Sequence, residues 1–189
     1  MGRETMDKLK FYEINTNYIQ YLKKYDHRVP NIDYKEHNKF LCGVVLDVNG
    51  NKYYAPVSSF CKEQQTNFII KNNKGKSIAS LRLSFMLPVP DRVLTIKNFK
   101  DEDYKYRRLL MEELKYCNDN LKAILIKANK VYRIAANERH PLNLCCCNFK
   151  LLEQKCLEYK TYVSAIDEVA TTIEEDRNID IENDEELEI

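Results

Sequence analysis

The spacing of the hydrophobic residues changes near residue 104, and this change most constrains the fold. From there to residue 135, apolar residues recur in alternating steps of four and three, which is the spacing of one face of an α-helix. The stripe consists of Leu110, Leu114, Cys117, Leu121, Ile124, Ala128, Val131 and Ala135. It predicts a long amphipathic helix, which Asn118-Asp119-Asn120 kinks or splits because these residues have poor helix propensity.

The residues before this stripe predict short strands instead. Their β-branched and aromatic content predicts strands over residues 9–15, 40–48, 52–57, 68–71, 80–87 and 92–96. Asn49-Gly50 predicts a tight hairpin between the second and third of these strands, because both positions tolerate positive φ. A short helix over residues 16–25, capped by Thr16 or Asn17, is expected between the first two strands.

The order of these elements predicts the fold class. Residues 80–87 alternate between two sets with a period of two, which is typical of a half-buried strand. Residues 26–38 predict a long loop, and residues 148–162 predict a final helix. We therefore expect an α+β domain with a small, mostly antiparallel sheet or half-barrel and helices, the long C-terminal ones included, packed on one side. This single domain would span residues 1–166, with an acidic, flexible tail over 167–189.

The near-neutral total charge conceals an uneven distribution. The whole chain has a formal charge of +1, but residues 167–189 contain 11 acidic residues and one basic residue, so residues 1–166 carry +11. A basic domain of this size often binds a polyanion, and nucleic acid is the leading candidate. Thirteen tyrosines without a tryptophan suit stacking of single-stranded bases, although tyrosine also suits half-buried strands.

The seven cysteines and the N-terminal residues predict a reducing compartment. The first ten residues are charged and lack the apolar segment of a secretory signal, and no apolar run approaches the ~20 residues of a membrane span. We therefore expect a cytoplasmic protein with free thiols. Cys145-Cys146-Cys147 cannot direct three sulfurs at one zinc ion, and no Cys-x-x-Cys pair is present, so we expect no metal site.

Several classes of enzyme are excluded or disfavoured by the residues available. Four glycines leave no Gly-rich phosphate loop, which excludes kinases, P-loop NTPases and dinucleotide-binding enzymes and predicts no cofactor. A hydrolase that uses Ser58 or Ser59 with His27, His37 or His140 stays open, although the Gly-x-Ser-x-Gly elbow is absent. RNA cleavage requires less, because the ribose 2′-OH is the nucleophile and the protein supplies cations, hydrogen-bond donors and proton transfer.

Side chains of the required types occur at the ends of neighbouring predicted elements. They are Tyr18, Tyr34, Lys39, Ser58, Ser59 and Lys62. Strand ends and loops are where functional sites usually lie. Each of these residue types is also common on a solvated surface, so the set alone is weak evidence for a nuclease.

Six short segments in a fixed order resemble those of a known family. They are Phe11-Tyr12-Glu13-Ile14 with Tyr18-Ile19 and Tyr21-Leu22-Lys23, Val29-Pro30-Asn31, Phe40-Leu41-Cys42-Gly43-Val44-Val45-Leu46, Lys52-Tyr53-Tyr54-Ala55-Pro56-Val57-Ser58-Ser59, Phe85-Met86-Leu87-Pro88-Val89 and Asn148-Phe149-Lys150-Leu151-Leu152-Glu153. Together they resemble the ToxN/AbiQ family, the toxins of type III toxin–antitoxin systems. The resemblance covers residues 9–160.

This resemblance implies a fold related to the small-barrel mRNA-interferase toxins, elaborated with helices. It implies a metal-independent, sequence-specific endoribonuclease that leaves a 2′,3′-cyclic phosphate and a 5′-hydroxyl. The implied partners are substrate mRNA, the antitoxin precursor RNA and a repeated RNA pseudoknot that inhibits the toxin in a cyclic protein–RNA assembly; neither DNA nor a membrane is expected. The implied role is abortive infection against phage, or plasmid maintenance.

The resemblance also assigns roles to individual residues. The family's helix tyrosine corresponds to Tyr18, and its loop tyrosine corresponds to Tyr34 or, with a shifted gap, to Lys35. Either tyrosine would position the ribose or stack on a base. The lysine before the hairpin corresponds to Lys39, which would hold the scissile phosphate or transfer a proton.

A serine pair completes the implied site. The Thr/Ser-Ser pair of the family corresponds to Ser58 and Ser59, which would stabilise the pentacovalent oxyanion. Some members carry a lysine two residues after the pair, where this chain has Cys61. Lys62 then takes the role through a one-residue shift, or the role is absent.

Basic residues on the long helix could extend the RNA-binding surface, although a solvated helix face explains them equally well. They are Arg107, Arg108, Lys115, Lys122, Lys127 and Arg133. The main alternative to the nuclease is a non-catalytic RNA-binding module with the same basic surface.

Overall fold

A computed structural model describes residues 8–32 and 39–166. Within these residues, one antiparallel sheet runs in the order β4, β5, β3, β2, β1 and β7, with β6 paired to β3. The strands are β1 (Lys10–Ile14), β2 (Leu41–Val48), β3 (Asn51–Ser58), β4 (Phe68–Lys71), β5 (Ser77–Leu81), β6 (Leu87–Pro88) and β7 (Leu94–Ile96). The predicted α+β class with a mostly antiparallel sheet is confirmed, and β4 and β7 are its two ends.

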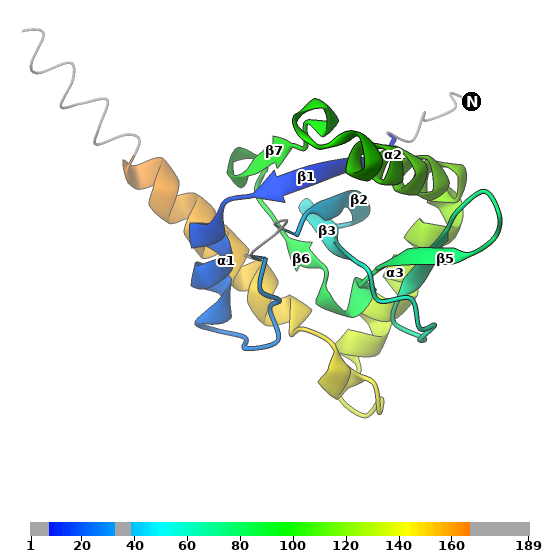
Figure 1. Cartoon of the computed structure of the whole chain (residues 1–189). Coiled ribbons are helices and arrows are strands. Elements are labelled where there is room, and N and C mark those ends of the chain that lie inside the picture. The colour runs from blue at the N-terminus through cyan, green and yellow to red at the C-terminus, as the bar shows by residue number, and fades with distance from the viewer. Residues whose placement is uncertain (1–7, 33–38, 167–189) are drawn as a thin grey trace, which may run out of the picture.

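Helices cover the sheet from more than one direction (Figure 1). They are α1 (Thr16–Lys23), α2 (Tyr104–Asp119), α3 (Leu121–Ala136) and a C-terminal helix described over residues 149–166, with short 3-10 turns η1 (Leu83–Phe85), η2 (Asp91–Val93), η3 (Phe99–Asp101) and η4 (Asn143–Cys145). In Figure 1, α1 and the C-terminal helix lie at one end of the sheet, and α2 and α3 lie at the other. Consecutive residues of β2 and β3 are buried, so both faces of these strands are covered.

The helical stripe divides where the sequence predicts a break. α2 ends at Asp119 and α3 begins at Leu121. The Asn120 side-chain amide donates to the Tyr116 carbonyl over 2.8 Å, which competes with continuation of the helix. Asn118 links the end of α2 to the sheet, because its side chain accepts from the Leu9 amide at 2.9 Å and donates to the Leu9 carbonyl at 3.1 Å.

The hairpin between β2 and β3 is also confirmed. Asn49 and Gly50 have φ values of 52° and 78°, the left-handed conformation that a tight hairpin requires. Gly43, which lies opposite Tyr54 in the register, has a different reason for its small size. A Cβ atom there would lie 2.1 Å from the Tyr54 ring, so the ring occupies the space of a side chain.

The strand predicted over residues 80–87 is wrong. β5 ends at Leu81, η1 follows, and β6 contains only Leu87 and Pro88. Ser84 is buried like Leu83, and its carbonyl accepts from the Cys147 amide at 2.9 Å. The leucines at two-residue spacing therefore belong to three elements that long-range packing separates.

The cap of α1 lies before the predicted residues. The capping residue is Asn15, whose side chain accepts from the Asn17 amide at 2.9 Å. Thr16, one of the two predicted caps, is already the first helical residue. Asparagine caps helices at least as well as threonine, because its side-chain oxygen readily reaches the exposed amides of the first turn.

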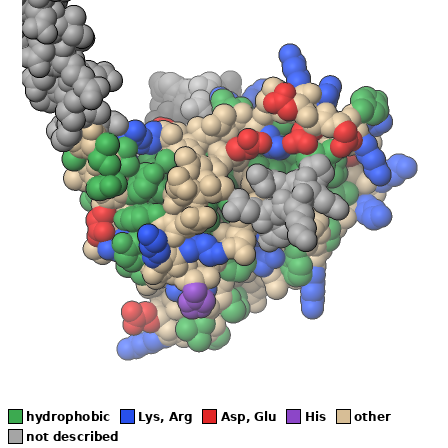
Figure 2. All heavy atoms as spheres, turned by 60° about the vertical axis from the view of Figure 1, so that its left-hand side comes forward, with side chains coloured by type: hydrophobic (Ala, Val, Ile, Leu, Met, Phe, Trp, Pro, Cys, Tyr) green, Lys and Arg blue, Asp and Glu red, His purple; other side chains and the backbone are tan. Residues whose placement is uncertain are grey.

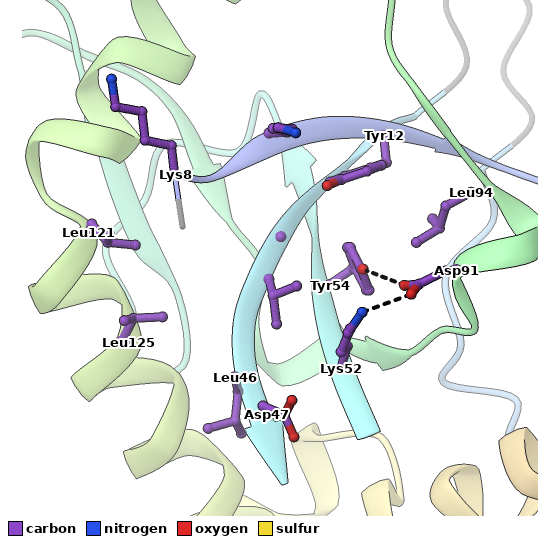
Figure 3. A pocket seen from close by; sticks show the side chains of 13 residues that line it. Lys8, Tyr12, Leu46, Asp47, Lys52, Tyr54, Asp91, Leu94, Leu121 and Leu125 are labelled. Atoms are coloured by element: carbon purple, nitrogen blue, oxygen red, sulfur yellow. Dashed lines mark hydrogen bonds and ion pairs between the residues drawn. The ribbon is translucent and has the colours of Figure 1, made fainter. Parts of the chain in front are cut away.

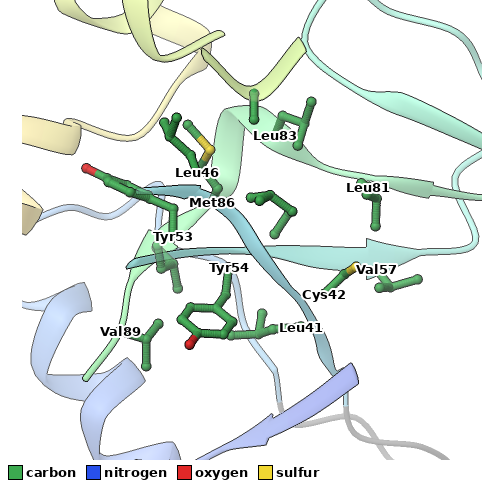
Figure 4. Close-up of a cluster of buried hydrophobic side chains, with 14 of the residues drawn as sticks. Leu41, Cys42, Leu46, Tyr53, Tyr54, Val57, Leu81, Leu83, Met86 and Val89 are labelled. Atoms are coloured by element: carbon green, nitrogen blue, oxygen red, sulfur yellow. The ribbon is translucent and has the colours of Figure 1, made fainter. Parts of the chain in front are cut away.

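Tyr53 connects the sheet to two helices in the core. Its hydroxyl donates to Glu153 Oε1 over 2.8 Å, and Tyr132 donates to the same oxygen over 2.6 Å. Its ring packs edge-on against those of Tyr132 and Phe149, with centroids 5.7 and 5.6 Å away. Figure 4 shows that Tyr53 and Tyr54 project to opposite sides of β3, as neighbouring strand residues do.

One buried carboxyl predicts how stability depends on pH. Glu113 in α2 is 5% exposed, and burial, with the nearby charge of Glu112, raises its pKa from 4.5 to about 7. The folded protein therefore binds a proton that the unfolded chain releases, so stability falls as pH rises from about 4.5 to about 7. The difference corresponds to roughly 3 kcal/mol.

We expect Glu113→Gln to remove this decline. Urea unfolding at pH 5 and pH 8 measures it: the variant should gain relative to wild type at pH 8 and gain little at pH 5. Glu138→Gln, at an exposed position, is the matched control and should shift neither value. An equal effect of Glu113→Gln at both pH values would contradict the assignment.

Candidate active site

Lys39 and Ser58 flank the end of the strand pair at which β2 begins and β3 ends. Leu41 pairs with Pro56, and the Val57 amide donates to the Phe40 carbonyl over 3.1 Å. Continuing this antiparallel register by one step places Lys39 opposite Ser58, and opposite residues project to the same side of a sheet. Lys39 and Ser58, to which the family resemblance assigns the scissile phosphate, therefore flank the same end of the strand pair, although 18 residues lie between them in the sequence.

Ser59 begins a loop beside this pair that several hydrogen bonds hold. Ser59 is exposed, and the half-buried Ser58 accepts from the Phe60 amide through its Oγ at 3.3 Å. The thiol of Cys61 donates to the Ser59 carbonyl over 3.2 Å. Lys62 is exposed, so its ammonium group is accessible to a polyanion, whereas the half-buried Cys61 offers only a thiol.

Two buried polar residues hold this loop, and sequence reasoning missed both. The Ser80 hydroxyl donates to the Phe60 carbonyl over 2.6 Å. The side chain of Asn67 donates to the Lys62 carbonyl at 3.0 Å and accepts from the Gln64 amide at 2.9 Å. Such a fixed loop can present hydroxyl groups and cations without rearrangement. The only sequence signal was that both residues are polar within apolar strand segments.

Tyr18 does not reach the surface with this group. Its side chain is 0% exposed, and its hydroxyl donates to the Pro88 carbonyl over 2.8 Å. Its ring packs on that of Tyr159 in the C-terminal helix, with centroids 4.8 Å apart. Burial also raises the pKa of Tyr18, which disfavours proton release. The expected contact with ribose or base is corrected to a structural role, since Tyr18 joins α1 to β6 and the C-terminal helix.

The predicted RNA-binding residues on the helices divide into two groups. Arg107 stabilises the fold, because its guanidinium donates to the carbonyls of Phe99, Lys100 and Glu102 at 2.8–3.0 Å. Arg107 therefore supports η3, and its expected RNA contact stays a prediction. Arg108, Lys115 and Lys122 are exposed; Lys115 forms an ion pair with Asp119, and Arg108 lies 5.8 Å from the centroid of the Tyr104 ring.

Two predicted site residues, Tyr34 and Lys35, lie outside the described residues, as do His37 and the acidic tail. The other histidines lie in loops. His27 is exposed, and Nδ1 of His140 accepts from the Leu142 amide at 3.1 Å. Within residues 8–32 and 39–166, neither His27 nor His140 shows a hydrogen bond to Ser58.

One face of the described surface carries charges of both signs. Figure 2 shows Lys and Arg side chains at separate points of one face, with acidic side chains between some of them. In the described part of the chain, no three His, Cys, Asp or Glu side chains gather as metal ligands would. Cys146 and Cys147 are buried, whereas Cys145 is exposed. Among the described helices, none has the length and apolar character needed to span a bilayer.

A cavity of about 710 Å³ lies near the other end of the β2–β3 hairpin (Figure 3). Lys8, Lys10 and Tyr12 line one part of it, and Lys52 and Tyr54 line another. Asp91 accepts from Lys52 at 2.7 Å and from the Tyr54 hydroxyl at 3.4 Å, which neutralises part of the positive charge. The buried residues Leu41 and Pro56 lie between this cavity and the Lys39–Ser58 pair, so the two features are separate.

Comparisons with known proteins agree with the fold and with the resemblance in sequence. Residues 10–157 match the family described as toxin ToxN, type III toxin–antitoxin system. The endoribonuclease ToxN of Bacillus thuringiensis subsp. kurstaki is 30% identical over 166 residues, which cover 82% of this chain and 86% of that protein.

Two solved structures share the fold. One shows selective inhibition of a bacterial type III toxin by a non-coding RNA pseudoknot, with a TM-score of 0.75, 30% identity and coverage of 82% of this chain and 99% of that chain. The other is AbiQ, a lactococcal anti-phage endoribonuclease of a type III system, with a TM-score of 0.74, 27% identity and the same coverage. Because the family match extends over residues 10–157, this chain belongs to the ToxN family of type III toxin–antitoxin toxins.

Proposed function

We propose that this chain is a sequence-specific endoribonuclease toxin of a type III toxin–antitoxin system, which cleaves RNA without a metal ion by attack of the ribose 2′-OH on the adjacent phosphate. The products are a 2′,3′-cyclic phosphate and a 5′-hydroxyl. The observation that carries the proposal is that Lys39 and Ser58 flank the same end of the β2–β3 pair, where the Val57 amide bonds the Phe40 carbonyl, with the exposed Ser59 next to Ser58. These groups provide one cation and two hydroxyl donors for a single phosphate.

The chemistry assigns a role to each group. As the 2′-oxygen attacks phosphorus, it loses its hydroxyl proton, negative charge grows on the two non-bridging oxygens, and the leaving 5′-oxygen gains a proton, so no net proton is consumed. The ammonium group of Lys39 and the Ser58 and Ser59 hydroxyls stabilise that charge, because preorganised donors stabilise a transition state more than they stabilise the substrate. In some family members a lysine stands at the position of Cys61. In this chain the next residue, Lys62, takes its role and binds the neighbouring phosphate.

An RNA antitoxin suits the same surface. An inhibitor that is itself RNA offers the phosphates and unpaired bases that the substrate offers, so it competes for the same groups. The related structure with an inhibitory pseudoknot supports this reading for the family. For this chain we propose inhibition by a repeated pseudoknot RNA in a cyclic assembly, cleavage of mRNA and of the antitoxin precursor, and a cytoplasmic role in phage defence.

Cleavage in the presence of EDTA tests the proposal directly. Purified protein incubated with A-rich RNA and excess EDTA should produce discrete fragments, whose 3′ ends carry a cyclic phosphate and whose 5′ ends accept phosphate from polynucleotide kinase. Fragments that appear only with added Mg²⁺ would contradict the metal-independent mechanism. A gel shift without cuts would favour the alternative, a non-catalytic RNA-binding module.

A further inference from the structure

Arg82 lies beside the candidate site and has no role in the proposed chemistry. It follows β5, and its backbone amide donates to the Pro56 carbonyl of β3 over 2.9 Å. That bond continues the pairing of Val57 with Leu81 and Ser58 with Ser80, so Arg82 projects to the same side of the sheet as Ser58. Its guanidinium carbon lies 4.7 Å from the centroid of the Phe60 ring, and Phe60 follows Ser59 directly.

Two aromatic rings hold the guanidinium group of Arg82 in place. A second ring, that of Phe85, lies 5.0 Å from its carbon atom, so two cation–π contacts orient the group. Nε is buried and has no hydrogen-bond partner, the one such side-chain atom within residues 8–32 and 39–166. Burial lowers the pKa of Arg82, yet arginine stays protonated in proteins. A buried donor without an acceptor lowers stability, and such a cost is typical of a functional position.

The group borders a small cavity with both polar and apolar walls. Its volume of about 210 Å³ is lined by Arg82, Gln64, Gln65, Thr66 and Ser84 and also by Phe85, Leu142 and Cys145. Pockets for drug-sized ligands measure about 300–1,000 Å³, so this cavity suits one part of a nucleotide. Gln64 and Gln65 belong to the loop that also carries Ser59 and Lys62, which places the cavity next to the phosphate-binding groups.

We propose that this cavity is a base-recognition subsite, in which Arg82 donates to the N7 edge of a purine at a fixed position beside the cleaved bond. The inference rests on the proposed nuclease function. Arginine pairs with guanine O6 and N7, and glutamine pairs with adenine N6 and N7, so this lining reads the edge that both purines share. A phosphate is the less suitable ligand, because Arg82 is the one cation in the lining and the other side chains are neutral.

The subsite is tested by combining an RNA that lacks the purine N7 atom with a protein variant that lacks the Arg82 guanidinium. Cleavage sites are first mapped by sequencing the 5′-hydroxyl ends from a randomised single-stranded RNA, and we expect a purine preference at one position next to the cut. An RNA with a 7-deazapurine at that position lacks only the acceptor. We expect wild type to cut it about 10- to 100-fold more slowly, whereas Arg82→Met should cut both RNAs equally, at the slow rate.

Arg82→Met keeps an unbranched side chain against both rings and removes the donors, so it separates recognition from folding. Its melting temperature should equal or exceed that of wild type, because the unsatisfied Nε is gone. Arg82→Lys, which keeps the charge but not the paired donors, should also lose the purine preference. Exposed Lys74→Met should leave the mapped preference unchanged.

Three outcomes would overturn the inference. An unchanged cleavage map for Arg82→Met excludes base recognition by this residue. A slower rate at all sites, with the purine preference intact and a weaker dependence on salt, assigns the guanidinium to a phosphate instead. A lower melting temperature with an unchanged map makes it a packing residue. If wild type itself leaves RNA uncut, the proposed function fails first, so the two failures are distinguishable.

Discussion

Lys39→Met is expected to slow RNA cleavage by about 10²- to 10⁴-fold, the size of effect seen when a charge-stabilising or proton-transferring group is removed. Methionine keeps most of the length of the side chain and removes the charge opposite Ser58. Single-turnover cleavage of a labelled RNA measures the chemical step, and survival of induced cells measures toxicity. Both should change in parallel, while the circular dichroism spectrum stays that of wild type.

Two comparisons make the Lys39 result specific. Lys74→Met removes a charge from the exposed turn between β4 and β5 and should retain near-wild-type activity. Combining Lys39→Met with Ser59→Ala should cost far less than the product of the two single effects, since groups that stabilise one transition state are not additive. Full toxicity of both single variants would refute the assigned site.

Tyr53→Ala is expected to destabilise the fold by about 3–5 kcal/mol, the usual cost of removing a buried aromatic ring. The ring is 0% exposed and packs between β3, α3 and the C-terminal helix through Tyr132 and Phe149. Its loss would also leave Glu153 with one hydrogen-bond donor fewer. Urea unfolding followed by circular dichroism gives the free energy of unfolding for each variant.

Tyr53→Phe is the matched control for this effect. It keeps the ring contacts and removes only the hydroxyl that donates to Glu153, so we expect a loss of roughly 1–3 kcal/mol. Because Ser58 stays in place on β3, the Tyr53→Phe variant should cleave RNA at 25 °C at a rate near that of wild type. Equal destabilisation by phenylalanine and alanine would show that the hydrogen bond, and not the packed ring, joins the strand to the helices.

Local sequence patterns correctly predicted the parts of the fold whose backbone conformation is set by residues close by in the sequence. The helical stripe, its break at Asn120 and the hairpin at Asn49-Gly50 all depend on backbone preferences or on contacts within a few residues. These preferences act in the unfolded chain as well as in the folded protein, so they can be read from sequence. Comparison with the family added the serine pair and Lys39, which spacing alone could not distinguish from solvated side chains.

Other positions were misread because several structures satisfy the same local pattern. Leu81, Leu83 and Leu87 recur at even spacing, yet they lie in β5, η1 and β6. Tyr18 was expected at the site because tyrosine can stack on a base, but packing against Tyr159 places it in the core. In each case burial against a distant segment outweighs the local preference.

The sequence by itself determined the helical stripe and its break, the turn between β2 and β3, the basic charge of residues 1–166 and the resemblance to a toxin family. Only the tertiary structure decided that Lys39 and Ser58 flank the same end of the β2–β3 pair and that Arg82 lies against Phe60 with an unpaired Nε. The physical reason is that hydrophobic spacing specifies which face of an element is buried, but not its neighbours. Strand register and side-chain contacts between distant segments set those neighbours, and with them the site.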